Sequence, residues 1–328
     1  MCCHNVRYRV GNIATETIEA IWRGEKLQRL RNALARYDMR SGCRFCDWRI
    51  SGGHFASLTM TTYDRFPVEE AVPVWPQMME FSMTNSCNLE CVMCTGQASS
   101  AIRARRERLP PLPRAYGEAF FIELQRFLPH LKRAKFLGGE PFLQPECFRI
   151  WDLMIGLDLR TPCHVTTNGT QWNAKIERVL EMLPVNISIS MDGISRQTVE
   201  AIRFGASYDV IMQNFRSFHS YARANNTVLS LTFCLMRQNW HELGEFCVFA
   251  DKWDCLVFVN TVRTPAAHSL YTLSPPELKL ILASMEKESS TLLPKLRGNL
   301  SVWVDEFERL RAFVRRGQTK NSRRYPTP

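Results

Sequence analysis

The sequence predicts an α/β protein, a partial (β/α)6 barrel preceded by a small cysteine-rich unit. Six short apolar or alternating segments lie between residues 78 and 265, and longer amphipathic segments separate them, which is the pattern of parallel β/α units. Short glycine-rich or polar motifs follow several of these segments, and the first such loop holds three closely spaced cysteines. Six units make three quarters of an eight-stranded barrel, so we expect an open barrel with its site at the C-terminal strand ends.

Residues 1–62 form the expected cysteine-rich unit. It contains Cys2 and a C-x2-C pair, Cys43 and Cys46, with an amphipathic helical segment between them. If folding brings Cys2 and the pair together, they close one metal site. Thiolates bind both iron-sulfur clusters and zinc, so both alternatives stay open at this site. Residues 63–77 carry three prolines, and we expect an extended linker there.

The remaining elements follow from the periodicity of the chain. Period-two alternation or short apolar runs predict strands at about 79–83, 133–137, 162–167, 186–191, 228–236 and 256–262. Helical periodicity predicts helices at 120–131, 145–155, 174–183, 195–223 with a break near Gly205, and 241–253. The core then spans residues 78–265. Residues 266–328 are expected to form two more helices, at 270–293 and 300–313, and a solvated basic tail.

Composition limits the class of protein. The chain has 328 residues, of which 45% are hydrophobic, so it can bury a substantial core. No apolar run is long enough for a membrane helix, and no stretch resembles a signal peptide. Twelve cysteines without export signals indicate metal or redox use in a reducing compartment. We therefore expect a cytoplasmic protein with no membrane partner.

The net charge of +10 is compatible with nucleic-acid binding, but its distribution argues against that partner. Five basic residues crowd the last fourteen positions, with no acid among them. A second basic run, Arg103, Arg105, Arg106 and Arg108, follows the cysteine trio. This run is either a solvated helix face or a surface that attracts an anionic substrate or partner.

The trio Cys87, Cys91 and Cys94 has gaps of three and two residues. Thiolates are the soft ligands that iron-sulfur clusters select. A cubane normally takes four cysteines, so a tight trio implies one iron left open to an outside ligand. A zinc site would need a fourth Cys or His at short range, and the nearest other cysteines, Cys46 and Cys147, are remote in sequence.

Two motifs downstream also indicate a ligand. Gly138, Gly139 and Glu140 follow the second expected strand, where glycines allow close backbone approach and a carboxylate suits an ammonium group. Alternation in the fourth strand places Ser190 and Asp192 on one polar face, which inside a barrel implies a ligand. Each loop taken alone is also consistent with ordinary turn chemistry.

The C-x3-C-x2-C trio resembles the cluster motif of the radical S-adenosylmethionine (SAM) superfamily. The resemblance implies the partial barrel of that family and a [4Fe-4S] cluster held by Cys87, Cys91 and Cys94. It also implies that the open iron chelates the amino and carboxylate groups of SAM. The residue before the last cysteine, usually aromatic in the family, is Met93 here, and a thioether also packs well beside a cluster.

The same resemblance implies the residues that contact SAM. Gly138, Gly139 and Glu140 correspond to the stretch that contacts the methionine amino group. By resemblance to the subfamily with SPASM domains, Ser190 contacts SAM and Arg203 pairs with its carboxylate. Arginine suits that role because two N–H donors of its planar guanidinium group can bind both oxygens of a carboxylate. The alternative for Arg203 is a charge on the surface of a helix.

The N-terminal unit resembles the end of a SPASM or twitch auxiliary-cluster domain. In such domains Cys2, Cys43 and Cys46 match ligands of an additional [4Fe-4S] cluster. Two features depart from that pattern. The family's first ligand would precede Cys2, and the unit comes before the core instead of after it, as in the tail of an earlier module or a truncated reading frame. Cys3, His4 or a substrate atom could supply the remaining ligand.

These resemblances predict a radical SAM enzyme similar to maturases. It would cleave SAM reductively and abstract hydrogen from a peptide, protein or small-molecule substrate, with an electron donor such as flavodoxin or ferredoxin. The fold does not choose among these substrates. The alternative is a non-catalytic, basic iron-sulfur or zinc protein that binds nucleic acid.

Overall fold

The computed structural model describes residues 5, 8–51, 55, 58–66 and 73–318, which form two compact units. The first unit contains the described residues up to Met79 together with Arg114–Lys132. The second contains Glu80–Pro113 and the described residues from Arg133 onward. The domain boundaries that the sequence suggests, at 62, 77 and 265, stay predictions. No helix in the described part of the chain is long and apolar enough to cross a membrane.

The first unit is helical where it is described. It contains α1 (Ile18–Arg23), α2 (Glu25–Ala35), α3 (Arg44–Ser51) and α4 (Glu118–Leu124), with 3-10 turns η2 (Thr59–Tyr63) and η4 (Leu128–His130). The amphipathic segment predicted before Cys43 is broken at Gly24, where a Cβ would lie 2.7 Å from the Ala20 carbonyl oxygen. Glu123 of α4 accepts hydrogen bonds from the N–H groups of Ile18 and Glu19, at 2.7 and 2.9 Å. This carboxylate therefore caps the N-terminus of α1.

A six-stranded sheet organises the second unit. Its strands are β1 (Met78–Phe81), β2 (Arg133–Phe136), β3 (Cys163–Thr167), β4 (Val185–Ser190), β5 (Leu229–Leu235) and β6 (Leu256–Thr261). The order along the sheet is β1-β2-β3-β4-β5-β6, and neighbours from β2 to β6 pair in parallel. Each strand lies beside its predecessor in the chain, which confirms the predicted partial barrel.

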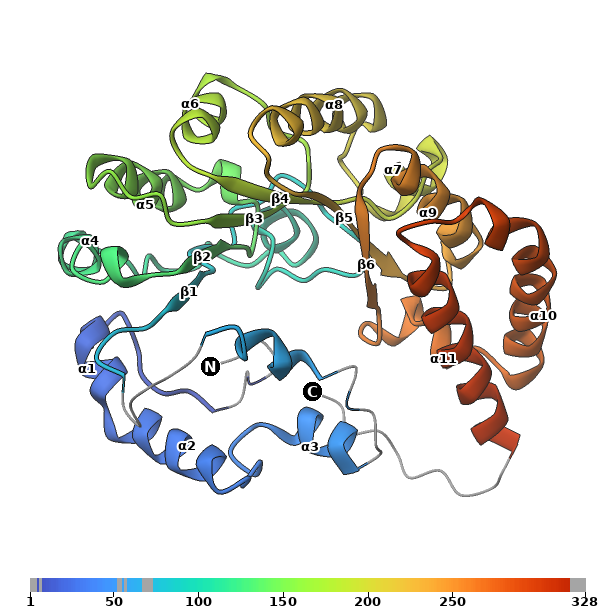
Figure 1. Cartoon of the computed structure of the whole chain (residues 1–328), viewed down its shortest axis with the longest axis horizontal. Helices are drawn as coiled ribbons and strands as arrows, with labels where there is room; N and C mark the ends of the chain where they lie inside the picture. The colour runs from blue at the N-terminus through green and yellow to red at the C-terminus, as the bar shows by residue number, and fades with distance from the viewer. Residues whose placement is uncertain (1–4, 6–7, 52–54, 56–57, 67–72, 319–328) are drawn as a thin grey trace. The chain divides into compact units, whose positions relative to one another are not determined.

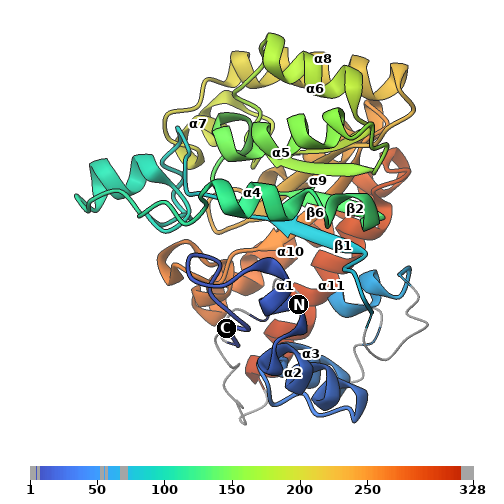
Figure 2. The same cartoon turned by 90° about the vertical axis from the view of Figure 1, so that its left-hand side faces the viewer.

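Helices cover one face of this sheet. They are α5 (Pro145–Gly156), α6 (Ala174–Met182), α7 (Arg196–Ile202), α8 (Tyr208–Ala224) and α9 (Leu243–Lys252). Figure 1 shows α5, α6 and α8 along the sheet, and Figure 2 shows them from the side. Aromatic rings pack between the sheet and these helices. The ring centroids of Phe136 and Trp151 lie 4.9 Å apart, and those of Phe142 and Phe218 lie 5.9 Å apart. The break predicted near Gly205 separates α7 from α8.

The other face of the sheet carries polar side chains. The Ser188 hydroxyl on β4 lies 2.9 Å from the Thr232 hydroxyl on β5, and Lys135 on β2 donates to Glu80 on β1 at 3.1 Å. His164 on β3 is in register with Lys135. Burial, and to a lesser extent the charge of Lys135, lowers the pKa of His164 to about 4. Since side chains alternate across a strand, these residues share the polar inner face that the sequence predicts.

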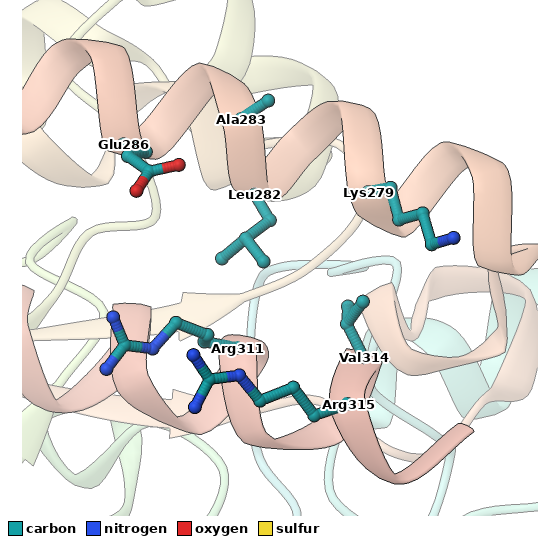
Figure 3. Close-up of a pocket in the computed structure, with 7 residues that line it drawn as sticks. All are labelled: Lys279, Leu282, Ala283, Glu286, Arg311, Val314 and Arg315. Atoms are coloured by element: carbon teal, nitrogen blue, oxygen red, sulfur yellow. The ribbon is translucent and has the colours of Figure 1, made fainter. Parts of the chain in front are cut away.

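Two helices, α10 (Pro275–Leu292) and α11 (Leu300–Gln318), follow β6 in the same unit. Trp303 of α11 is buried, and its indole N–H donates to the Ser289 hydroxyl of α10 at 3.0 Å. A groove of about 370 Å³ between the helices is lined by Lys279, Leu282, Ala283, Glu286, Arg311, Val314 and Arg315 (Figure 3). Arg315 and Arg316, which the sequence assigns to a solvated basic tail, are exposed, but they lie in the last turn of α11, where the helix dipole favours cations. The tail beyond Gln318 lies outside the described residues.

Candidate functional site

The cysteine trio lies in the loop that follows β1. Cys91 is buried, and Cys87 and Cys94 are half-buried. Burial raises the pKa of Cys91 to about 11, although the charge of Arg203 lowers it, and the thiols of Cys87 and Cys94 are close enough to raise it further. The three thiols therefore share one electrostatic environment. The described residues contain no group of three His, Cys, Asp or Glu side chains placed to hold a single metal ion. In a cubane each thiolate binds its own iron, so the trio need not converge on one point.

Hydrogen bonds fix the backbone of this loop from two sides. The Ser100 hydroxyl accepts from the Cys87 N–H and donates to the Cys87 carbonyl, both at 3.1 Å. On the other side, the Val92 N–H donates to the carbonyl of Ile202, at the end of α7, at 2.9 Å. Met93 packs with Val92 against a buried apolar group that includes Ile202 and Met236. The loop therefore has a defined conformation and an apolar wall beside its thiols.

The glycine turn after β2 lies directly against the cysteine loop. Gly138 and Gly139 have φ angles of +80° and +55°, a region that glycine adopts without strain. A Cβ on Gly138 would lie 2.0 Å from the Ser82 hydroxyl oxygen, and one on Gly139 would lie 2.5 Å from the Ser86 carbonyl oxygen. The Glu140 N–H also donates to the Ser86 carbonyl at 2.7 Å. The sequence therefore needs glycine at both positions for the turn to approach the loop.

The Glu140 carboxylate is fully buried and accepts hydrogen bonds from the chain itself. Its donors are the Phe142 N–H at 3.1 Å, the Thr167 hydroxyl at 2.8 Å and the Asn168 N–H at 2.6 Å. Burial raises the pKa of Glu140 to about 7, although these three donors lower it. The carboxylate thus joins the end of β2 to the end of β3. The Asn168 side-chain amide also lies 3.8 Å from the Cys87 sulfur, a contact that the sequence does not predict.

Arg203, which directly follows α7, is only 5% exposed, so the interpretation as a surface helix charge is wrong. Its Nη2 lies 2.8 Å from Asp192 Oδ2, and its Nη1 lies 3.9 Å from the Cys91 sulfur. Burial lowers the pKa of Arg203, but the charges of Asp192 and Cys91 raise it more, so the side chain stays cationic. Arg203 Nε is buried and has no hydrogen-bond partner among the described residues.

The sequence places Asp192 on the inner face but does not predict its pairing with Arg203. The second Asp192 oxygen accepts from the Cys234 N–H on β5 at 2.6 Å. The polar alternation of β4 is the signal that identifies Asp192, whereas its partner follows the end of α7 and no local pattern connects them. Ser190, the last residue of β4, is half-buried, and its hydroxyl has no hydrogen-bond partner in the described part of the chain.

These residues fit a [4Fe-4S] cluster and a small zwitterion beside it. Three thiols that can bind iron as soft thiolates lie in one loop, and the buried guanidinium of Arg203 beside Cys91 would offset negative charge on a bound cluster. The orphaned Arg203 Nε and the close glycine turn provide polar contacts for a second group. The observation that decides the fit is that three separate motifs of the sequence, the trio, the glycine turn and Arg203, meet at the cysteine loop.

The N-terminal cysteines are described only in part. Cys2, Cys3 and His4 lie outside the described residues. Cys46 is buried in the first turn of α3, and the sulfur of Cys43 lies 3.6 Å from the side-chain amide of Asn5. Whether Cys2 joins this pair stays a prediction.

The residues of this site lie within a match to a known protein family. Residues 81–250 match the radical SAM superfamily, and residues 1–47 match an iron-sulfur cluster-binding domain, SPASM. Mycofactocin maturase MftC of Mycobacterium ulcerans (strain Agy99) is 24% identical over 198 residues, which are 57% of this chain and 48% of that protein. The AdoMet-dependent heme synthase of Methanosarcina barkeri (strain Fusaro / DSM 804) is 29% identical over 134 residues, which are 39% of this chain and 34% of that protein.

Among solved structures, Streptococcus suis SuiB bound to S-adenosylmethionine aligns with a TM-score of 0.47 and 12% identity, over 66% of this chain and 48% of that chain. The chain spans about half the length of the curated relatives it matches. The superfamily match covers just over half of the chain and includes the trio, the glycine turn and Arg203. The chain belongs to the radical SAM superfamily, and its N-terminal residues match the SPASM domain.

Proposed function

We propose that this protein cleaves SAM reductively at a [4Fe-4S] cluster and abstracts hydrogen from a substrate, as a maturase-like enzyme. The observation that carries the proposal is the meeting of Cys87, Cys91 and Cys94 with the glycine turn and the buried Arg203. When bound, the cluster supplies the electron that splits SAM into methionine and a 5′-deoxyadenosyl radical. The matched superfamily favours this enzyme over the alternative of a non-catalytic protein that binds nucleic acid.

The chain's own residues would bind and orient the two groups. Cys87, Cys91 and Cys94 would hold three irons, and Met93 would keep water away from them through its apolar packing. Gly138 and Gly139 would let the backbone contact the amino group of SAM, because neither residue has a side chain between its backbone and SAM. Glu140 would act from behind the turn, as its carboxylate already accepts three hydrogen bonds from the chain.

The other end of SAM would meet Arg203 and Ser190. Two of the guanidinium nitrogens of Arg203 already lie near Asp192 and Cys91, and Nε is the one without a partner in the described residues. We assign Nε to the carboxylate of SAM, since a charged hydrogen bond there offsets the burial of both groups. The Ser190 hydroxyl, half-buried at the end of β4, would contact SAM beside it.

We further propose a peptide as the substrate, with a protein or small molecule as the alternative. The relatives in mycobacteria are named maturases, which supports this choice. The electron would come from a small carrier such as flavodoxin or ferredoxin. A cytoplasmic location is also a proposal, supported by the use of thiols as ligands in a compartment that keeps them reduced.

The N-terminal unit would hold an auxiliary [4Fe-4S] cluster through Cys2, Cys43 and Cys46. The match of residues 1–47 to the SPASM domain supports this assignment. We expect the site to be labile, because only three cysteines match the pattern and a cluster needs its thiolates preassembled. A zinc ion is the alternative occupant.

One experiment tests the main proposal. The protein is reconstituted anaerobically with iron and sulfide, and 5′-deoxyadenosine is measured after addition of dithionite and SAM. The wild type should form the product, and the Cys87→Ala/Cys91→Ala/Cys94→Ala variant should form none. Cys247→Ala, which removes a buried thiol of α9, is the matched control and should retain activity. Absence of product from the wild type, or equal product from the triple variant, would contradict the proposal.

A further inference from the structure

The arginine run after the cysteine loop is attached to the loop itself. It lies in and beside η3 (Ile102–Arg106), a helix with one wide turn in which the Glu107 N–H donates to the Ile102 carbonyl at 2.9 Å. The buried Ile102 side chain anchors the helix, and the Ala101 N–H just before it donates to the Cys87 carbonyl at 3.3 Å. The position of the arginines is therefore tied to the position of the thiols.

Two arginines of this run contact the loop directly. Arg106 Nη1 lies 3.2 Å from the carbonyl oxygen of Glu90 and 3.4 Å from that of Cys91. Arg105 Nη1 lies 3.2 Å from the buried Glu90 carboxylate, yet the Arg105 side chain is 70% exposed. Positive charge thus reaches from the backbone around Cys91 to the protein surface.

The surface around these contacts carries more positive than negative charge. Arg105, Arg106 and Arg108 are exposed. Of the two acids beside them, Glu90 is buried and paired with Arg105, and Glu107 is exposed and accepts from the Gly96 N–H at 2.7 Å. The segment lies in the second unit and projects beyond the sheet, as the teal ribbon at the left of Figure 2 shows. A projecting surface of this kind is accessible to a partner of protein size.

An apolar contact accompanies the charge. Leu109 is 46% exposed directly after Arg108, and the next two residues are exposed prolines. Small transient interfaces combine a few exposed apolar groups with complementary charge. The charge raises the rate of association more than it raises the affinity. We call Arg105, Arg106, Arg108 and Leu109 the arginine surface.

We propose that the arginine surface is the docking site for the acidic carrier protein that reduces the cluster. The inference rests on the proposed function and adds the place where the electron enters. The carrier, an acidic flavodoxin, would lose one electron and the cluster would gain it. Position favours this partner over an anionic substrate: a reductant must come close to the cluster, and the arginine surface is hydrogen-bonded to the backbone at Cys91.

The test compares two reductants on the reconstituted full-length protein. Dithionite is a small molecule that needs no docking surface, whereas flavodoxin, reduced by its reductase, does. The variant Arg105→Gln/Arg108→Glu removes charge from the surface and keeps Arg106, the arginine that contacts the backbone carbonyls of Glu90 and Cys91. Glutamine in place of Arg105 retains an N–H donor for the Glu90 carboxylate. The matched control is Lys279→Glu/Arg315→Gln, which makes the same change of charge in the groove between α10 and α11 (Figure 3).

We expect all three proteins to form 5′-deoxyadenosine with dithionite at rates within about twofold of each other. With flavodoxin at low ionic strength, the arginine variant should be slower by about tenfold or more, since electrostatic steering changes association rates by about 10 to 1000-fold. The control should match the wild type. Salt should slow the wild type toward the variant, because it screens exposed charge.

Three results with the variants would overturn the proposal. The arginine variant could retain the wild-type rate with flavodoxin, it could lose activity equally with dithionite, or the control could fall as far as the variant. Arg108→Glu alone, at an exposed position, keeps the test decisive if the double variant does not fold. A wild type that forms no product with dithionite would refute the proposed function itself, which is a different outcome. A wild type that accepts dithionite but not flavodoxin would refute docking only.

Discussion

Gly139→Ala tests whether the glycine turn positions the cysteine loop. The new Cβ would lie 2.5 Å from the Ser86 carbonyl oxygen and 3.0 Å from the Asn85 carbonyl carbon. Non-bonded contacts settle at about 3.5 Å, so the backbone just before Cys87 would move by about 1 Å. Overpacking adds about 1 to 3 kcal/mol and the positive φ adds about 1 to 2 kcal/mol. We therefore expect the free energy of unfolding to fall by about 2 to 5 kcal/mol.

Urea unfolding of the apoprotein, iron content after reconstitution and the yield of 5′-deoxyadenosine measure the effect. All three should fall in Gly139→Ala, since the shift displaces a thiolate that holds the cluster. Gly156→Ala is the matched control: it ends α5 with nothing within 4 Å of the added Cβ, and its stability should not fall, because alanine is favoured over glycine in a helix by up to about 1 kcal/mol. If Gly139→Ala were as stable and as rich in iron as Gly156→Ala, the turn would not support the loop.

Three further predictions address separate sites. Arg203→Ala should weaken SAM binding by about 1.5 to 3 kcal/mol through loss of a charged hydrogen bond, while exposed Arg216→Ala should not; equal SAM affinities by calorimetry would remove Arg203 from the site. Cys43→Ala/Cys46→Ala should lower total iron by less than half of the wild-type value and leave SAM cleavage intact, whereas a wild type with about eight stable irons would contradict the labile auxiliary site. His164→Gln should make the free energy of unfolding less dependent on acid pH. The pKa of His164 is about 4 in the folded protein and 6.5 in its reference state, so between pH 6.5 and pH 4 the unfolded chain binds a proton that the folded protein does not. The wild type should thus lose about 2 kcal/mol between pH 7 and pH 5 relative to the variant in urea unfolding, and parallel pH profiles would refute this.

The strands could be predicted from sequence because each has a period-two or apolar signature that needs no long-range information. All six lie within two residues of the predicted bounds. Helix ends were harder to predict. The break at Gly24 depends on the close approach of one backbone atom, and the helical state of Arg315 depends on the packing of α11 on α10. Gly24 itself is a local signal that helical periodicity alone does not take into account, whereas the packing of α11 leaves no local pattern in the sequence.

Part of the candidate site could also be predicted from local sequence patterns, and part could not. The motifs around Cys87 and Gly138 are contiguous in the chain and could be recognised directly. The ion pair of Asp192 with Arg203 and the three donors to Glu140 join separate elements, so they needed the structure. The structure also shows that Glu140 accepts hydrogen bonds from its own chain, a role that the short motif does not predict.

The central claim is that the cluster held by Cys87, Cys91 and Cys94 has an iron open to SAM. Electron paramagnetic resonance of the dithionite-reduced, reconstituted protein, recorded with and without SAM, tests it most directly. SAM should change the spectrum of the wild type, because binding at the open iron alters the ligands of that cluster. The Cys87→Ala/Cys91→Ala/Cys94→Ala variant should lack the SAM-sensitive signal. Any remaining signal should come from the auxiliary site and should not change when SAM is added. A wild-type spectrum that SAM leaves unchanged, or a SAM-sensitive signal in the triple variant, would contradict the claim.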